Sequence, residues 1–170
     1  MPSWTPNFDW ITDHLAVGGS FRREQTERLT EHGIRAVVDL RNEDVDDERL
    51  LGRHGIELLH LPTQDMCGVA QEHLDRGVRF AVRHLDRGER VLVHCEHGIG
   101  RSAVLALCIL VQRGRAPLEA LDLLKDRRAR IAPSPEQFAC WSRWLEQHRR
   151  VHASVWQVPD LDDFKTIAYR

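Results

Sequence analysis

The 170-residue sequence predicts a single α/β domain in which helices flank a central, mostly parallel sheet. Three observations lead to this fold class. Short apolar runs typical of buried strands alternate along the chain with amphipathic stretches. Most of the amphipathic stretches stop at a glycine, which is common just after a helix. Apolar residues make up 42% of the sequence, enough for the core of one domain of this length.

The first part of the chain holds most of the predicted strands. The run IRAVVDL is β-branched and apolar, like a strand buried on both faces, whereas the stretch ending at Gly55 is charged and typical of a helix. In chain order we expect one or two strands in residues 10–19, a short helix at 22–32, a strand at 34–40, a helix at 43–54, a strand at 56–61 and a loop at 62–69.

The second part is dominated by helices. Apolar residues at positions 74, 78, 81, 82 and 85 follow one face of a helix. Ser134, Pro135 and Gln137 have the spacing of a capping box that begins the last helix. We expect a helix at 71–87, a strand at 90–94, helices at 102–112 and from 117, a final helix from 134, and a tail at 151–170 with no assigned role.

Charge and cysteine content narrow the class of partner. A net charge of −2 argues against nucleic acid or an anionic membrane as a partner. The first residues show no leader pattern, and the longest apolar run, 103–111, is too short to span a bilayer. The four cysteines form no C-x-x-C pair, so no zinc site is expected. Reduced thiols in the cytoplasm are the expectation that follows.

The stretch VLVHCEHGIGRSAVLAL at 91–107 carries the chemistry. It predicts a strand, a tight loop and a helix, a turn that directs backbone N–H groups and the positive end of the helix dipole at an anion. Gly98 and Gly100 let the loop bend closely. Arg101 offers a planar fork that matches two phosphate oxygens. Cys95 faces these positive groups, which favour its nucleophilic thiolate.

Other interpretations of this stretch fit less well. A Walker A loop would need glycine at Cys95 and lysine at Arg101. A dinucleotide fingerprint would need glycine at Ala103 and would leave Cys95 unexplained. A lone cysteine at a strand end is commonly a small buried hydrophobe. Here it stands within nine positions of four other specified residues: His94, Gly98, Arg101 and Ser102.

HCEHGIGRS resembles the H-C-x-x-G-x-x-R-[ST] signature of the protein tyrosine phosphatase superfamily, in particular its compact dual-specificity branch. The segments FDWITDHLAVGG, VVDLRNED, LPTQDMCG and RIAPSPEQF resemble other parts of that branch, so the resemblance covers about residues 8–150. It implies a phosphatase-like catalytic domain over residues 1–150. It also implies a two-step reaction through a cysteinyl-phosphate, with no metal and no other cofactor.

Site residues follow from the resemblance by position. Cys95 would be the nucleophile, Arg101 the phosphate ligand, and Ser102 the residue that assists the sulfur as a leaving group. The arginine lies six positions after the cysteine, which gives a seven-residue loop suited to phosphate, whereas rhodanese-type loops are shorter. The phosphate cradle would be formed by the backbone amides of Glu96, His97, Gly98, Ile99, Gly100 and Arg101.

Asp65 is the candidate general acid, because ester cleavage needs a proton for the leaving oxygen. It lies in the loop after the strand at 56–61, a position that resembles the family's acid loop. The alternatives are an ordinary turn aspartate, the acidic group 43–48, expected as a solvated helix face, and Asp75, expected on a helix surface. The family's proline after the acid is missing.

Cys67 is either an ordinary thiol or a disulfide partner for oxidised Cys95.

The expected activity is hydrolysis of phosphate monoesters, chiefly phosphotyrosine in proteins, with phosphoserine and phosphothreonine as further substrates. The alternatives are an RNA 5′-triphosphatase, an inositol-phosphate phosphatase and a phosphate-binding module without catalysis. Glu96 and His97 make the loop rim less positive, which weighs against highly anionic inositides. No basic patch with interleaved aromatic residues supports RNA. The expected partner is therefore a phosphorylated protein or a small phosphate ester, with no membrane.

Overall fold

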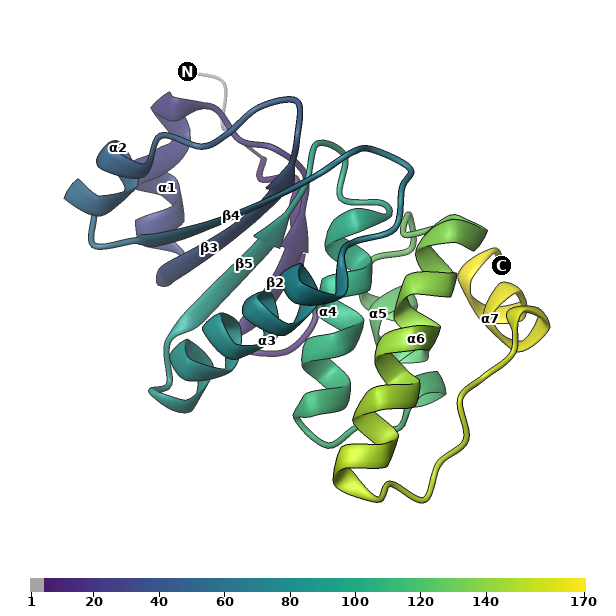
Figure 1. Cartoon of the computed structure of the whole chain (residues 1–170). Helices are drawn as coiled ribbons and strands as arrows, with labels where there is room; N and C mark the ends of the chain where they lie inside the picture. The colour runs from purple at the N-terminus through teal and green to yellow at the C-terminus, as the bar shows by residue number, and fades with distance from the viewer. Residues whose placement is uncertain (1–4) are drawn as a thin grey trace.

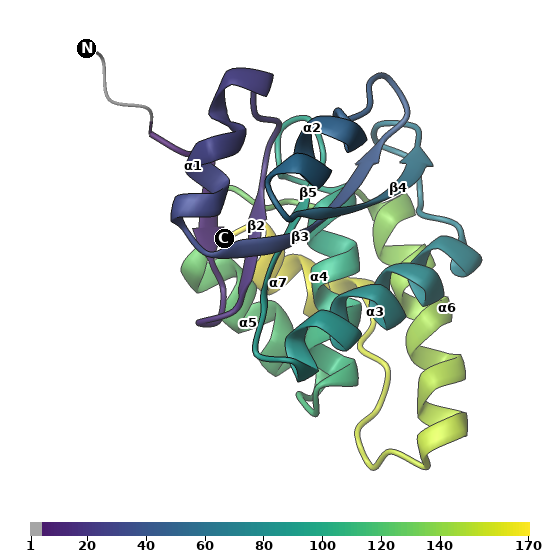
Figure 2. The same cartoon turned by 90° about the vertical axis from the view of Figure 1, so that its left-hand side faces the viewer.

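A computed structural model describes residues 5–170 and contains a five-stranded sheet with helices on both faces (Figures 1 and 2). The strand order is β1-β2-β5-β3-β4. Only the β1–β2 pair is antiparallel, and the other three pairs are parallel. The predicted mostly parallel sheet is therefore confirmed. The strands are β1 (Phe8–Trp10), β2 (Leu15–Gly18), β3 (Ile34–Arg41), β4 (Glu57–Thr63) and β5 (Arg90–His94).

The helices divide unequally between the two faces (Figure 2). A short 3₁₀ turn, η1 (Arg23–Gln25), leads into α1 (Thr26–Glu31), and this helix covers one face together with α2 (Glu48–Arg53). The longer helices lie on the other face. They are α3 (Gln71–Asp86), α4 (Arg101–Gln112), α5 (Pro117–Arg127), α6 (Pro135–His152) and α7 (Leu161–Ala168).

Helix α4 is the centre of the larger layer. Every residue from Arg101 to Val111 is buried, as expected for a helix that is apolar all round. It contacts the sheet and also α3, α5 and α6. Because β5 leads directly into α4, the loop between them is held at both ends by the most deeply buried elements of the molecule. This arrangement places residues 95–100 rigidly at the carboxyl edge of the sheet.

The structure corrects two expectations about helices. The helix expected at 43–54 begins only at Glu48, where the Asp47 side chain accepts the Leu50 N–H at 2.9 Å. Residues 42–47 form a loop instead, because Glu43 is drawn into contact with Arg101.

The helix after Ser134 begins with the predicted capping box but is not the last. Helix α7 follows, and its buried Phe164 packs on Phe138 with ring centroids 4.8 Å apart.

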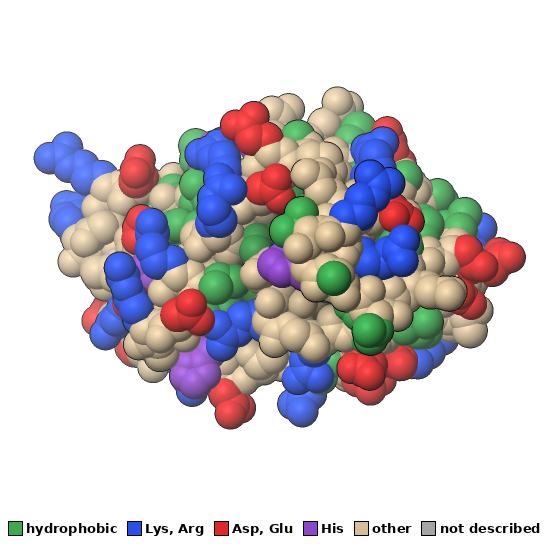
Figure 3. Space-filling model, turned by 60° about the horizontal axis from the view of Figure 1, so that its bottom comes forward, with side chains coloured by type: hydrophobic (Ala, Val, Ile, Leu, Met, Phe, Trp, Pro, Cys, Tyr) green, Lys and Arg blue, Asp and Glu red, His purple; other side chains and the backbone are tan. Residues whose placement is uncertain are grey.

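No helix within residues 5–170 combines the length and the apolar character needed to cross a membrane. On the face that comes forward in Figure 3, basic and acidic side chains are mixed with each other and with apolar ones. Neither sign of charge covers that face. The view agrees with the small net charge of the sequence.

Candidate active site

Cys95 lies at the end of β5 with 3% of its surface exposed. Its Sγ accepts the Gly98 N–H at 3.3 Å and lies 3.3 Å from the Ser102 hydroxyl oxygen. Burial alone would raise the pKa of Cys95. The hydrogen bonds from Ser102 and Gly98, together with the charge of Arg101, outweigh burial and lower this pKa. The thiolate that can attack phosphorus is therefore favoured.

The loop closes around this sulfur only because two of its residues are glycine. Gly98 has a φ of +69°, and a Cβ atom there would lie 2.4 Å from the Gly18 carbonyl carbon. A Cβ atom on Gly100 would lie 2.3 Å from the Gln137 Oε1. A side chain at position 98 would therefore force β2 away from the loop, and one at position 100 would displace the Gln137 side chain.

Arg101 is 1% exposed and is fixed from several sides. Its Nη1 donates to the Glu43 carboxylate at 2.7 Å and to the Thr63 carbonyl at 2.9 Å. Its Nη2 donates to the second Glu43 oxygen at 2.9 Å and lies 3.4 Å from Asp65 Oδ1. The buried Nε has no hydrogen-bond partner. Since buried N–H groups are nearly always paired, this N–H is available to an anion in the cradle.

Glu43 is a site residue that the sequence reasoning misplaced on a solvated helix face. It lies in the loop after β3 and holds both terminal nitrogens of Arg101. The hydrogen bond from Arg101 lowers the pKa of Glu43 to about 2, so at neutral pH this carboxyl has no proton to donate. The strand order could have indicated it, because β3 pairs with β5 in parallel and the loops that follow both strands meet at one edge.

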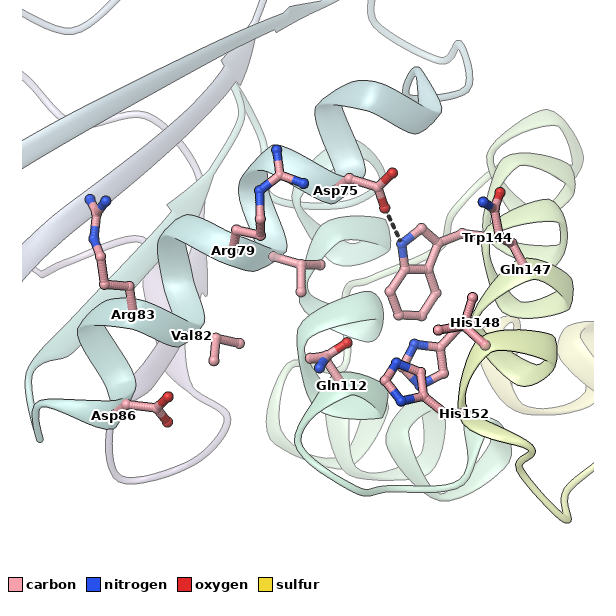
Figure 4. A pocket seen from close by; sticks show the side chains of 12 residues that line it. Asp75, Arg79, Val82, Arg83, Asp86, Gln112, Trp144, Gln147, His148 and His152 are labelled. Atoms are coloured by element: carbon pink, nitrogen blue, oxygen red, sulfur yellow. Dashed lines mark hydrogen bonds between the residues drawn. The ribbon is translucent and has the colours of Figure 1, made fainter.

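Asp65 lies in the loop after β4, with its side chain 55% exposed and one oxygen 3.4 Å from Arg101 Nη2. The next residue, Met66, has a φ of +66°. Its carbonyl accepts the Ser134 hydroxyl at 3.0 Å, which ties this loop to the start of α6. The structure thus brings Cys95, Arg101 and Asp65 together, whereas Asp75 on α3 accepts the indole N–H of Trp144 (Figure 4).

His94 braces the loop from inside and is fully buried. Its Nδ1 lies 3.0 Å from the Cys95 carbonyl oxygen, and its Nε2 lies 2.5 Å from Asp46. Burial alone would lower the pKa of His94. The hydrogen bond and negative charge of Asp46 prevail and raise it to about 8. The protonated ring can donate to both partners at once and so joins the cradle to the loop that carries Glu43.

Arg41 extends this buried network. Its guanidinium donates to Asp39 at 3.1 Å, to Asp46 at 3.0 Å and to Glu96 at 3.2 Å. Asp39, Asp46 and His94 are the one group among residues 5–170 with spacing that could hold a metal ion. Arg41 donates to both carboxylates, and the protonated His94 ring supplies the second positive charge that balances them.

Arg128 is a second residue that the sequence reasoning missed, since an arginine after a helix is usually solvated. It is 2% exposed. Its Nε donates to the Gly98 carbonyl at 2.8 Å, and its Nη2 donates to the His97 carbonyl at 3.0 Å. Its Nη1 donates to Asp9 at 2.9 Å, and Nη2 also donates to Asn7 at 3.0 Å. Arg128 therefore fixes the outer carbonyls of the cradle against the N-terminal strand.

A separate groove of about 560 Å³ runs between α3 and α6. Figure 4 shows Trp144 and His148 along one side and Val82 along the other. The Trp144 and His148 rings are stacked with centroids 4.7 Å apart. No residue of the cradle lines this groove. It is therefore separate from the loop that holds Cys95 and Arg101.

These features define a cysteine-dependent phosphatase of the dual-specificity type. The family model described as polymorphic toxin system, DSP-PTPase phosphatase, matches residues 17–115. The chain belongs to this family, within the protein tyrosine phosphatase superfamily, and is a phosphatase. The family resemblance found in the sequence is thereby confirmed.

The chain is also similar to individual proteins. It is 33% identical over 141 residues to phosphatidylglycerophosphatase and protein-tyrosine phosphatase 1 of Rattus norvegicus, covering 76% of this chain and 72% of that relative. The human protein of the same name is 31% identical over the same length and is covered to 70%. The crystal structure of Tk-PTP in its active form matches with a TM-score of 0.77 at 25% identity, covering 84% of this chain and 98% of that one.

Proposed function

We propose that this phosphatase hydrolyses phosphotyrosine in proteins through a cysteinyl-phosphate intermediate. One observation carries the proposal: a buried thiol with a lowered pKa shares a glycine-closed cradle with an arginine whose buried Nε has no partner. A phosphoryl group bound there would accept N–H donors from the loop and from Arg101 while its phosphorus faces Cys95.

In the first step, the Cys95 thiolate attacks phosphorus, and a sulfur–phosphorus bond forms as the bond to the ester oxygen breaks. Asp65 gives its proton to the departing oxygen. In the second step, water attacks phosphorus and yields its proton to the Asp65 carboxylate, while the sulfur leaves as thiolate. The Ser102 hydroxyl, 3.3 Å from the sulfur, stabilises that thiolate by donating to it.

Glu43 and Arg128 are positioning residues in this proposal. Glu43 sets the plane of the Arg101 guanidinium, and Arg128 fixes the carbonyls of His97 and Gly98 so that the amides of the loop keep their direction. The cytoplasm is the compartment that suits such chemistry. The four cysteines of the chain are all free, as reduced thiols are there.

A lipid phosphate monoester is a second candidate substrate, and one specific finding favours it. The relatives from rat and human are both named as phosphatidylglycerophosphatases as well as protein-tyrosine phosphatases. The same cradle would serve either ester, because it contacts only the phosphoryl group. The surroundings of the cradle must therefore decide between them.

Two variants test the proposal against an aryl phosphate and a phosphotyrosine peptide. Cys95→Ser should reduce turnover of both by about a thousandfold or more while a non-hydrolysable phosphotyrosine analogue still binds. Asp65→Asn should lose about 10²- to 10⁴-fold on the peptide but less on p-nitrophenyl phosphate, whose leaving group needs little protonation. Cys67→Ser is the matched control and should retain parent activity. Turnover surviving in pure Cys95→Ser would overturn the nucleophile assignment.

A further inference from the structure

A cleft of about 1150 Å³ opens directly beside the cradle. One wall is the segment from Ser20 to Thr26, and the other is the loop after β3, from Asp44 to Asp47. Glu96, the residue next to Cys95, belongs both to the cradle and to this cleft. Its Oε1 accepts the Ser20 hydroxyl at 3.0 Å, which fixes it at the junction. Because Glu96 is shared, the cleft adjoins the cradle, and the group attached to a bound phosphate would lie near it.

Negative groups are in excess in this cleft. Five carboxylates and three guanidinium groups line it. Two of the guanidinium groups are already paired, since Arg23 lies 2.8 Å from Asp47 and Arg41 donates to Asp46 and Glu96. Arg22 is the remaining lining cation, and among residues 5–170 no carboxylate lies within ion-pair distance of it.

Asp44 is the carboxylate in the cleft best placed to meet an incoming cation. Its side chain is 68% exposed, and its contact with Arg41 is long, at 3.6 Å. Glu43, which is 42% exposed and paired with Arg101, adds one more carboxylate at the mouth of the cradle. A group beside the phosphate thus faces carboxylates on several sides.

The remaining lining is polar as well. Hydroxyl and amide side chains outnumber apolar ones, with Phe21, Val45 and Leu51 as the apolar members. An acyl chain would find little apolar surface here, whereas a peptide backbone with polar or cationic side chains would keep its hydrogen bonds. A second phosphate on the substrate would meet an excess of like charge, with Arg22 as the one lining cation not paired to a described carboxylate.

We infer that this cleft selects protein substrates with lysine or arginine beside the phosphorylated residue. The inference rests on the proposed phosphotyrosine phosphatase function and specifies its substrate class. Cations of the substrate would approach Asp44 and Glu96 while the phosphate occupies the cradle. A phosphoglycerol-type headgroup carries only negative charge and so offers no cation to the carboxylates of the cleft.

Phosphotyrosine peptides of equal length that differ only in flanking lysine, alanine or glutamate test the inference. At low salt, kcat/KM should be about 5- to 25-fold higher with lysine than with glutamate, as one or two partly exposed ion pairs allow, and salt should reduce the ratio. Asp44→Lys should reverse the preference, so that kcat/KM becomes higher with the glutamate peptide than with the lysine peptide. Glu119→Gln, on exposed α5, is the matched control and should keep the parent's preference.

A phospholipid monoester in neutral detergent micelles completes the comparison. Turnover of this lipid above that of every peptide would overturn the inference in favour of a lipid substrate. Equal turnover of all peptides, with aryl phosphate still hydrolysed, would overturn the charge preference and leave the phosphatase chemistry intact. Failure to hydrolyse even the aryl phosphate would overturn the proposed function itself.

Discussion

Arg101 meets two demands that conflict in most side chains. It keeps a full positive charge while 1% exposed, and in the proposed mechanism it must also leave one donor unused for the substrate. Glu43 and the Thr63 carbonyl resolve this by binding only the terminal nitrogens. The guanidinium is thus oriented before any phosphate arrives, so less conformational entropy is lost when phosphate binds.

Glu43→Gln tests this orientation. The amide keeps the size of the side chain but replaces a charge-assisted pair, so we expect kcat/KM for p-nitrophenyl phosphate to fall about tenfold. The pH–rate profile should keep its alkaline limb, because a carboxyl with a pKa of about 2 is not the acid. A flattened alkaline limb would instead identify Glu43 as the proton donor. Glu48→Gln, at the exposed start of α2, serves as the control.

Helices α3 and α6 together support the loop that carries Asp65, the proposed general acid. The Val69 N–H, just before α3, contacts Cys140 Sγ at 3.3 Å, and the Gln71 amide donates to the Cys140 carbonyl at 2.8 Å. One turn further along, the Trp144 indole donates to Asp75 at 3.1 Å (Figure 4). The position of Asp65 therefore depends on contacts made by α6, far along the chain.

The variants Trp144→Phe and Asp75→Asn test how much the hydrogen bond between Trp144 and Asp75 contributes to stability. Each variant should lower the free energy of unfolding by about 1 kcal/mol, and the double variant should lose less than the two single losses combined. Aryl phosphate turnover should stay near that of the parent, because neither residue touches the cradle. Urea unfolding followed by far-UV circular dichroism provides the measurement. Strict additivity would mean that the hydrogen bond contributes nothing.

The sequence predicted elements well where the pattern was local. The strand–loop–helix around Cys95 and the capping box at Ser134 depend on neighbouring residues, and the structure contains both. The helix predicted over 43–54 was wrong at its start, because the charged residues there were taken to be solvated. In the structure Asp46 binds His94 and Glu43 binds Arg101 across the sheet edge. Contacts between residues so far apart in the chain produce no local or periodic pattern in the sequence from which they could be predicted. Arg128 escaped prediction for the same reason.

For the whole molecule, the buried His94–Asp46 pair links stability to pH. The folded-state pKa of His94, about 8, lies above its ordinary value of 6.5, so folding favours the protonated form. This stabilisation, about 2 kcal/mol, is full below pH 6.5 and is lost as pH rises through about 8.

Urea unfolding at pH 6 and pH 9 should show this loss in the parent. Asp46→Asn removes the charge that holds the proton on His94, so the variant should lose clearly less stability between the two pH values. Groups elsewhere in the chain titrate alike in both proteins and cancel in the comparison. An identical pH dependence in parent and variant would show that the pair does not control stability.

The contacts of Arg128 and β2 also determine when the protein can assemble during translation. Strand β2 pairs only with β1 and β5, and the Cys95 N–H donates to the Gly18 carbonyl at 3.3 Å. Arg128 then joins Asn7 and Asp9 to the carbonyls of the cradle. Because β5 and Arg128 come later in the chain, β1 and β2 have only each other as sheet partners until those parts have been synthesised. The cradle is incomplete in a shorter nascent chain, so we expect phosphatase activity only after Arg128 has been made.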